Sequence, residues 1–312
     1  MKRRSLGSGG LLVSELGIGT NTFGRYCDAA QSRAILDTAL ELGVDFIDTA
    51  DVYGGGLSET YIGEAIQGRR DKFVICTKTG YGIQAEADPG GLSRRRLIAR
   101  LDDSLRRLKT DHVDVYYMHT PDRNTPLAET LRTLDDLVSA GKIRYPAHSN
   151  HPGWQIAEIA GICRAGGYVE PVVSQSQWNL VERGVEAEVV PACEHFGLGM
   201  IPYSPLAGGF LTGKYRRGED GPEGARGTGN EAFRARWMKD ENVAALERYE
   251  SFAAARGRTV AELAVSWLLA HPVVSSVITG VTSPDQLRSN AKSIEWELTT
   301  EELAELKPKP VA

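Results

Sequence analysis

Short apolar runs alternate with amphipathic stretches along the whole of this 312-residue chain. Eight of these runs are typical of buried strands, and they centre on residues 16–19, 46–47, 73–76, 113–116, 143–145, 172–174, 200–201 and 277–278. Stretches with helical spacing of their apolar residues lie between the runs, as at Leu97, Leu101, Leu105 and Leu108. Strict alternation predicts a parallel sheet, and eight strands close such a sheet into a barrel. We therefore expect an α/β fold, a (β/α)8 TIM barrel, as a single domain over residues 1–312.

Two segments fall outside this repeat. Residues 5–13 resemble a small β-hairpin that precedes the first barrel strand and would plug the bottom of the barrel. Residues 206–230 are rich in glycine and charge, and they predict a long loop after the seventh strand. Because the active-site loops of a barrel follow its strands, we interpret this loop as a lid.

A doubly wound sheet is the rival fold, because Gly17, Gly19 and Gly24 suggest a dinucleotide-binding fingerprint. The fingerprint needs its third glycine at position 22, which is Thr22 here. A lone Gly-x-Gly after a strand is weak evidence, so the barrel is preferred.

Composition narrows the class of protein. The net charge is −5 and both signs are mixed along the chain, which argues against nucleic acid or an anionic membrane as the main partner. The four cysteines are scattered without a Cys-x-x-Cys pair, which predicts reduced thiols and no metal site. We see no signal peptide and no apolar run near the ~18 residues of a membrane span. A cytoplasmic protein is expected.

Polar residues end three of the predicted strands. Asp48 follows the run 44–47, Lys78 follows 73–77, and His119 follows 113–118. Tyr53 lies in a glycine-rich loop just beyond Asp48. Because the carboxyl ends of parallel strands share one mouth of a barrel, we expect these four side chains to meet there.

The four residue types fit proton transfer to a carbonyl that receives a hydride. Negative charge develops on the carbonyl oxygen, and a donor must supply a proton. Tyr53 is the predicted acid, since a phenol with a pKa of about 10 is neutral at pH 7. Lys78 would favour the phenolate, Asp48 would hold Lys78, and His119 would orient the carbonyl oxygen or relay the proton. Each residue alone has an ordinary structural explanation, but four at one mouth point to function.

Several motifs resemble the aldo-keto reductase family, over nearly the whole length of the chain. They are residues 6–20, 48–54, 141–145 with Ser149 and Asn150, 203–206, and 211–215. The similarity is greatest to a bacterial branch that also resembles potassium-channel β subunits. It implies a barrel that binds a nicotinamide cofactor in extended form without a Rossmann motif.

The resemblance also implies cofactor-binding residues. Ser149, Asn150 and Gln175 would hold the nicotinamide carboxamide, and Tyr203 would stack on the ring. The backbone near Gly19, Thr20 and Asn21 would line the same site, while Ser204, Leu206 and Gly208 would approach the pyrophosphate. Gly280, Thr282 and Ser283 would face the adenosine phosphate, with Gln286 and Asn290 at the adenine.

The start of the last helix suits a phosphate. Ser283 with Gln286 predicts a capping box, and Pro284 fits the first helical position. A helix N-terminus presents free N–H groups to an anion. Relatives usually carry a Lys or Arg near positions 280–284 for the 2′-phosphate of NADP, which this chain lacks, leaving Arg288 as a candidate. NADP(H) is the expected cofactor, and NAD(H) is the alternative.

The leading interpretation is an oxidoreductase that uses NAD(P)H to reduce an aldehyde or ketone to an alcohol. A cofactor-binding regulatory subunit with slow turnover and a sugar dehydrogenase running toward oxidation are the alternatives. The candidate pocket aromatics are Phe23, Tyr26, Tyr81, Trp178 and Phe210, although core packing is the preferred interpretation of Trp178. Asp122 and Arg123 would meet a polar substrate such as a sugar, or are turn residues. Whether the chain forms a homo-oligomer stays open.

Overall fold

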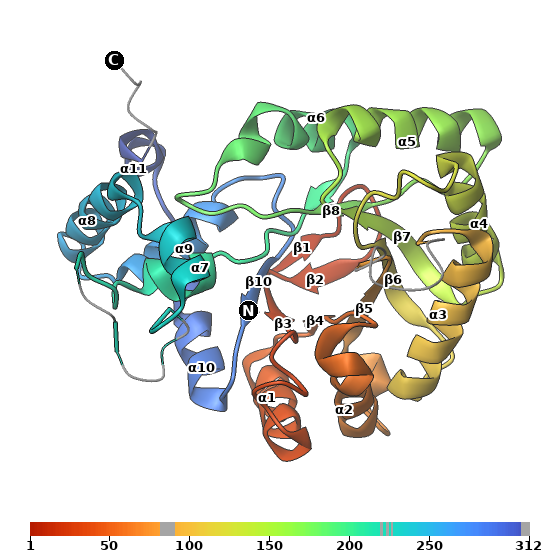
Figure 1. The fold of residues 1–312 in the computed structure, drawn as a ribbon, viewed down its shortest axis with the longest axis horizontal. Coiled ribbons are helices and arrows are strands. Elements are labelled where there is room, and N and C mark those ends of the chain that lie inside the picture. The colour runs from red at the N-terminus through yellow and green to blue at the C-terminus, as the bar shows by residue number, and fades with distance from the viewer. Residues whose placement is uncertain (82–90, 219–220, 223–224, 226, 307–312) are drawn as a thin grey trace.

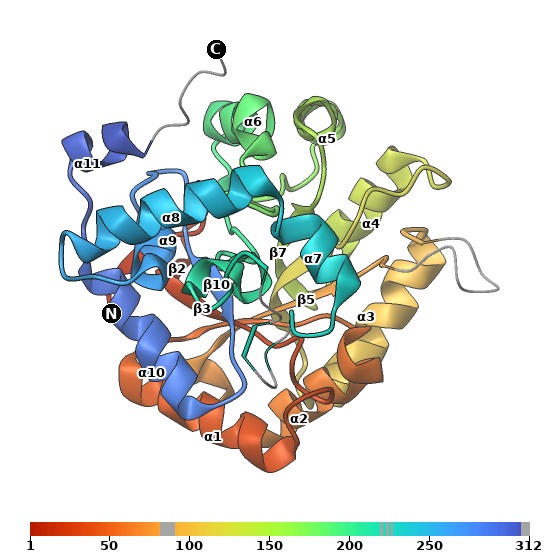
Figure 2. The same ribbon diagram turned by 60° about the vertical axis from the view of Figure 1, so that its left-hand side comes forward.

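The structure is a computed structural model that describes residues 1–81, 91–218, 221–222, 225 and 227–306. Eight parallel strands form one curled sheet with helices around its outside (Figures 1 and 2). The strands are β3 (Leu16–Gly19), β4 (Phe46–Asp48), β5 (Val74–Thr79), β6 (Val113–Met118), β7 (Ile143–Ser149), β8 (Val173–Gln175), β9 (Gly199–Met200) and β10 (Val277–Gly280). All eight predicted strands and the (β/α)8 fold class are confirmed.

Backbone hydrogen bonds join the two ends of the sheet. The strand order runs β10-β3-β4-β5-β6-β7-β8-β9. Met200 N donates to Val273 O at 2.7 Å, and Ser275 N donates to Met200 O at 2.9 Å. Ile278 N donates to Pro202 O at 3.2 Å. These bonds connect β9 to the segment that enters β10, so the carboxyl ends of all eight strands surround one mouth.

The helices begin and end where local chemistry directs. They are α1 (Ala29–Leu42), α2 (Leu57–Ala65), α3 (Arg94–Leu108), α4 (Leu127–Ser139), α5 (Gly153–Gly166), α6 (Val189–Phe196), α7 (Glu231–Trp237), α8 (Asp240–Ala254), α9 (Val260–Leu269), α10 (Pro284–Lys292) and α11 (Thr300–Glu305). Thr259 and Glu262 form a full capping box at α9, and Gly43 ends α1 in the left-handed conformation. In the described part of the chain, none of these helices has the length and apolar character needed to span a bilayer.

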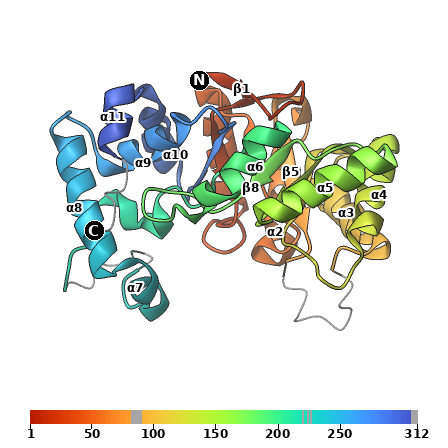
Figure 3. The ribbon, with the colours of Figure 1, turned by 90° about the horizontal axis from the view of Figure 1, so that it is seen from above.

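The predicted N-terminal hairpin is present and closes the bottom of the barrel. Strands β1 (Arg3–Ser5) and β2 (Leu12–Ser14) pair antiparallel. Leu6 and Val13 are fully buried in the barrel interior. Figure 3 shows the hairpin at the end of the molecule opposite α7, which belongs to the connection after β9.

The long connection between β9 and β10 carries α7, α8 and α9. Phe210 and Tyr215, at its start, are buried in a core cluster with Phe233 of α7. Positions 219–220, 223–224 and 226 of the predicted lid lie outside the described residues. The loop is therefore confirmed, while its role as a lid stays a prediction.

Substitution of Gly7 tests how tightly the N-terminal hairpin packs against the bottom of the barrel. Its φ is +59°, and an added Cβ would lie 2.1 Å from Val172 O and 2.6 Å from Gly199 N. We expect Gly7→Ala to lower the free energy of unfolding by about 2 kcal/mol or more, because both backbone strain and overlap oppose it. Gly10→Ala is the matched control in the same hairpin, since no atom lies within 4 Å of its added Cβ. Urea unfolding followed by tryptophan fluorescence measures both; equal effects would contradict tight packing at Gly7.

Candidate active site

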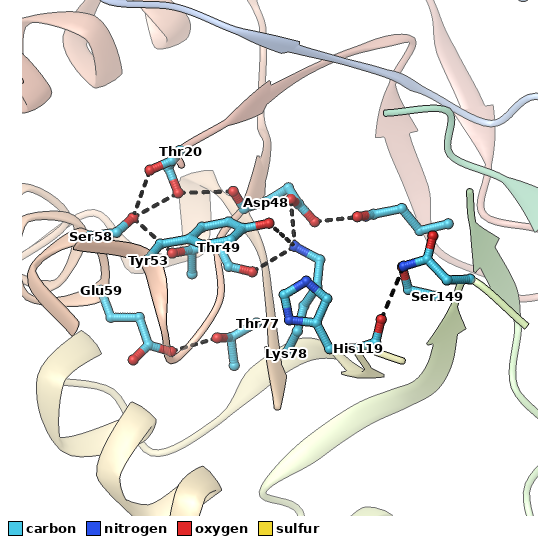
Figure 4. A network of polar contacts seen from close by, with 12 residues as sticks. Thr20, Asp48, Thr49, Tyr53, Ser58, Glu59, Thr77, Lys78, His119 and Ser149 are labelled. Carbon is cyan, nitrogen blue, oxygen red and sulfur yellow. Dashed lines mark hydrogen bonds and ion pairs between the residues drawn. The ribbon is translucent and has the colours of Figure 1, made fainter. Parts of the chain in front are cut away.

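Four side chains meet at the mouth of the barrel (Figure 4). Asp48 ends β4, Lys78 lies near the end of β5, and His119 directly follows β6. Tyr53 opens a 3-10 turn over Tyr53–Gly56. Lys78 Nζ lies 2.6 Å from Asp48 Oδ2 and 3.5 Å from Tyr53 Oη. The ring of His119 lies 6.0 Å from the ring of Tyr53.

The Asp48–Lys78 ion pair is buried and fully hydrogen-bonded. The side chains of Lys78 and Asp48 are 0% and 4% exposed. Lys78 Nζ also donates to Thr49 O at 2.8 Å, and Gln175 Nε2 donates to the second oxygen of Asp48 at 2.8 Å. Burial is the largest single influence and lowers the pKa of Lys78, but Asp48, together with Tyr53 and Cys76, leaves this pKa raised. Lys78 is therefore charged at neutral pH.

Tyr53 is held in its protonated form. Burial is the largest influence and raises the pKa of Tyr53, and together with the charge of Asp48 it exceeds the lowering by the nearby Lys78 ammonium. As expected, the interaction with Lys78 by itself lowers the pKa of Tyr53 and so favours the phenolate. The net direction is upward, because removing the phenolate from water costs more than the ammonium returns. Tyr53 therefore carries a proton that it can donate at neutral pH.

His119 is neutral. Burial, reinforced by the charge of Lys78, lowers its pKa to about 3. Its Nδ1 is buried and has no hydrogen-bond partner among the described residues. A neutral imidazole beside Tyr53 can donate one hydrogen bond to an oxygen in the mouth.

The turn that presents Tyr53 depends on glycine. Gly54, Gly55 and Gly56 have φ values of +58°, +65° and +93°. A Cβ on Gly54 would lie 2.7 Å from Phe23 O. Only glycine combines this left-handed path with so close an approach of two loops.

Helix α2, which follows this turn, is anchored by a charge that the sequence interpretation missed. Glu59 is fully buried, and its carboxylate accepts from Thr77 Oγ1 of β5 and from Arg107 Nε of α3 at 2.7 Å. The sequence does contain a sign of this buried charge, because Glu59 lies on the same face of the helix as the apolar residues Ile62 and Ala65. The contact ties α2 to the strand that carries Lys78.

Most residues predicted for the nicotinamide end lie beside His119. Asn150 Nδ2 donates to His119 O at 3.2 Å and to Ser149 Oγ at 3.0 Å. Tyr203 Oη donates to Asn150 Oδ1 at 3.0 Å. Asn150 has a left-handed φ of +61°, a strained conformation that is often kept at functional sites.

Three residues from β3 and the loop after it complete this side. Thr20 is buried, and its hydroxyl donates to Asp48 O at 2.9 Å. A Cβ on Gly19 would lie 2.7 Å from Ile278, so the backbone there is closely packed. Asn21 is exposed, with its Oδ1 3.7 Å from the position that a Cβ on Gly280 would take. Gln175 was predicted to hold the nicotinamide carboxamide. Its amide nitrogen instead donates a hydrogen bond to Asp48 Oδ1.

The segment predicted for the pyrophosphate follows an irregular path. Ser204, Ala207, Gly208 and Gly209 all have positive φ, and Leu206 is half-buried. Lys214 Nζ lies 3.7 Å from the position that a Cβ on Gly209 would take. This ammonium was missed as a binding residue, although it lies within the family-like motif 211–215.

The start of α10 differs from the expected capping box. Ser283 Oγ accepts from Gln286 N at 3.3 Å, as predicted. Gln286 Oε1 accepts from Thr282 N at 2.9 Å rather than from Ser283 N, so the box is only half formed. Arg288 pairs with Glu41 of α1 at 2.6 Å, which engages the guanidinium that was the candidate for a 2′-phosphate. Gly280 is exposed and Asn290 half-buried at the same end.

The predicted pocket aromatics divide into two groups. Tyr26 and Tyr81 are more than half exposed, and the Tyr81 ring lies 4.9 Å from the His119 ring. Phe23 and Phe210 are fully buried in core clusters, so their assignment to the pocket was wrong, while the burial of Trp178 agrees with its preferred interpretation as core packing. Asp122 accepts from Leu92 N and Asn124 N, one bond on each oxygen, which favours its interpretation as a turn residue.

A (β/α)8 barrel with a buried ion pair, a protonated tyrosine and a neutral histidine at its mouth fits the class of enzymes that transfer a proton to or from a substrate. The model of the Aldo/keto reductase family matches residues 15–309. The chain belongs to this family, and membership supports an oxidoreductase that uses a nicotinamide cofactor.

Relatives of similar length agree. A probable voltage-gated potassium channel subunit beta of Oryza sativa subsp. japonica is 36% identical over 301 residues, which cover 95% of this chain and 92% of that protein. The uncharacterized oxidoreductase YrpG of Bacillus subtilis (strain 168) is 36% identical over 312 residues, with 96% and 93% covered. A probable channel subunit beta of Arabidopsis thaliana is 36% identical over 303 residues, with 95% and 92% covered.

Two further buried histidines lie next to Ser149. His148 is fully buried on β7, and neither ring nitrogen has a hydrogen-bond partner among the described residues. His151 Nδ1 lies 2.9 Å from Ser149 O, and the two rings are 5.1 Å apart. Burial lowers the pKa of His148 well below its usual value and that of His151 to about 4.

The lowered pKa of His151 predicts that the folded protein loses stability in acid. An unfolded histidine takes up a proton near pH 6.5, whereas folded His151 stays neutral down to about pH 4. Its contribution to stability is therefore complete above pH 6.5 and is lost as the pH falls toward 4. We expect the unfolding free energy of the wild type to fall by about 1.4 kcal/mol per pH unit relative to His151→Asn in this window. Urea unfolding at pH 8, 6.5, 5.5 and 4.5 measures the difference, and parallel curves would contradict it.

Proposed function

We propose that this protein is an NAD(P)H-dependent oxidoreductase that reduces an aldehyde or ketone to an alcohol, with Tyr53 as the general acid. The observation that carries the proposal is the geometry of the mouth. Tyr53 Oη lies 3.5 Å from the ammonium of Lys78, which Asp48 holds at 2.6 Å. Family membership supports the cofactor class.

The cofactor site is proposed for residues on both sides of this mouth. A bound nicotinamide cofactor supplies the hydride. Ser149, Asn150 and Tyr203 would hold the nicotinamide end, since they form one hydrogen-bonded set against His119. The left-handed turn at Gly208 and Gly209, with Lys214 beside it, suits the pyrophosphate.

At the other end, the helix start at Ser283 suits a phosphate of the adenosine. NADP(H) is the proposed cofactor from the family resemblance, with NAD(H) as the alternative. The alternative gains some support from the contact of Arg288 with Glu41, because that pair engages the nearest candidate cation.

The protein residues would act in sequence on one oxygen. The neutral His119 imidazole donates a hydrogen bond that orients the substrate carbonyl. Tyr53 gives its proton to the oxygen as negative charge develops there. The phenolate left behind is stabilised by the Lys78 ammonium, which Asp48 keeps charged. In the reverse direction, the same phenolate accepts a proton from an alcohol.

The rim of the mouth favours a substrate with an apolar or aromatic body. Four exposed large hydrophobic side chains belong to the loops near the turn of Tyr53. Val52 and Leu57 flank the turn in the chain, Tyr26 belongs to the loop whose Gly24 packs against Leu57, and the Tyr81 ring lies beside the His119 ring. Exposed apolar groups that cluster beside a reactive centre are typical of ligand contacts. Both oxygens of Asp122 already accept backbone hydrogen bonds, one from Asn124 N in its own turn and one from Leu92 N, which disfavours a sugar substrate.

A regulatory subunit with slow turnover is the second candidate. The names of two relatives, potassium channel subunits beta, favour it. The complete set of Asp48, Tyr53, Lys78 and His119 favours an enzyme. Steady-state oxidation of NADPH and NADH with a panel of aldehydes separates the two, because tight cofactor binding without turnover would favour the subunit.

Tyr53→Phe tests the acid. We expect kcat to fall by about 10³-fold, because only the transferable proton is removed, while the Kd for NADPH changes less than about twofold. Stopped-flow reduction and NADPH fluorescence titration measure the two quantities. Tyr249→Phe is the control, since it removes a buried phenol bonded to Leu180 O in the α8 region. Retained kcat in the Tyr53 variant would refute the assignment.

Tyr81→Ala tests the apolar rim. We expect KM for an aromatic aldehyde to rise about fivefold, with less than a twofold change for a short aliphatic aldehyde, since an aromatic contact contributes roughly 1 kcal/mol. Leu12→Ala is the control, because Leu12 is comparably exposed but lies on the hairpin at the opposite end of the barrel. A uniform rise for both aldehydes would show that Tyr81 does not select the substrate body.

A further inference from the structure

Asp51 connects the turn of Tyr53 to the end of strand β5 by two bonds. Its backbone N donates to Lys78 O at 3.1 Å, and its Oδ2 accepts from Thr79 Oγ1 at 2.7 Å. Tyr53 N in turn donates to Ala50 O at 3.1 Å, so Asp51 lies inside the tight turn that ends at Tyr53. The two residues that hold Asp51 therefore include Lys78 itself, the partner of Tyr53.

The carboxylate of Asp51 is poorly satisfied. Its Oδ1 is inaccessible to solvent and has no hydrogen-bond partner among the described residues. Leaving such an oxygen unpaired costs stability, and an ionised group costs more than a neutral one. A position where an uncharged side chain would be more stable, but where a carboxylate is kept next to a reactive turn, suggests a functional reason.

Titratable side chains from three neighbouring elements influence the charge of Asp51. Glu59 of α2 is the like charge, Arg100 and Arg107 of α3 are the opposite charges, and Tyr116 of β6 lies on the same side. Burial is the largest influence, and together with Glu59 it exceeds the arginines and the Thr79 hydroxyl, which raises the pKa of Asp51 to about 6. Asp51 is thus ionised at neutral pH and protonated in mild acid.

We propose that Asp51 is a positioning residue whose ionised carboxylate clamps the Tyr53 turn to Thr79, and so sets the distance between Tyr53 and Lys78. The inference rests on the proposed function, because it assigns Asp51 a part in presenting the general acid. Protonation places a hydrogen on an oxygen that has no acceptor, and it weakens the charge-assisted bond from Thr79. The clamp then loosens, and the Tyr53 hydroxyl leaves its place beside Lys78.

Turnover should therefore follow the charge of Asp51. Wild-type kcat should fall as the pH drops below about 6, the value where this carboxyl titrates. His119, with a pKa of about 3, stays neutral through that range and adds nothing to this limb. The neutral isostere Asp51→Asn should show a low kcat at all pH values, equal to that of the wild type in acid.

The experiment compares three variants of the full chain from pH 5 to pH 9, with NADPH and an aromatic aldehyde. Asp51→Asn should lose the acid limb and lower kcat at pH 8 about tenfold, with the Kd for NADPH within twofold. Thr79→Val removes the donor of the clamp, so it should lower kcat at pH 8 about as much as Asp51→Asn does and move the remaining acid limb to higher pH. Asp114→Asn is the control, a partly buried carboxylate that holds Ile75 N and Arg70 at the opposite end of the barrel. It should keep the wild-type pH profile.

A measurement of stability distinguishes positioning from plain structural support. Asp51→Asn should raise the midpoint of thermal unfolding at pH 8. This gain should shrink as the pH falls below about 6, where the folded wild type takes up the proton, and vanish below about 4, where the unfolded chain takes it up as well. Lower activity together with higher stability is the opposite of what loss of a merely structural contact produces.

The outcomes separate this inference from the proposed function. If the wild type turns over and Tyr53→Phe does not, an Asp51→Asn variant with normal kcat and an intact acid limb overturns the role of Asp51 alone. If the wild type shows no turnover, the proposed function fails.

The crystal structure of Asp51→Asn at pH 8 tests the clamp without any measurement of turnover. A longer distance from Tyr53 Oη to Lys78 Nζ than in the wild-type crystal structure supports the clamp, and an unchanged distance overturns it.

Discussion

The ion pair between Asp48 and Lys78 is the interaction on which the mouth of this barrel depends. An ammonium with no exposed surface would lose its proton in an apolar interior, yet Asp48 and the carbonyl of Thr49 keep it charged. The pair exists only because β4 and β5 lie side by side, with Asp48 opposite Cys76 in the register. The charged site therefore depends on the pairing of these two neighbouring strands.

The surroundings of this pair are built from distant parts of the chain. Thr20 after β3 bonds the carbonyl of Asp48, and Gln175 from β8 on the other side of the barrel bonds its carboxylate. Such a network is stable only when every member is satisfied, because each unpaired buried group costs free energy. Among the buried polar atoms that have no partner in the described part of the chain, those of His119 and Asp51 lie beside the phenol of Tyr53 or in its turn.

The eight strands were predictable because a buried parallel strand needs a short continuous apolar run, and each run here is separated from the next by a helix with its own apolar face. The four residues at strand ends were predictable for the same reason, since parallel strands bring their carboxyl ends to one side. The pocket was less predictable. Phe23, Trp178 and Phe210 are as aromatic as Tyr26 and Tyr81, but only the packing of neighbouring loops decides which rings stay exposed.

By itself, the order of residues determined the barrel, the hairpin below it and which side chains stand at its mouth, because these follow from local periodicity and strand direction. The tertiary structure alone decided how those side chains ionise and which partners they take. Burial raises the pKa of Tyr53 despite Lys78, and Glu41 engages an arginine that is far from it in the chain. Desolvation and long-range pairing depend on atoms that only the folded chain brings together, and no local pattern encodes them.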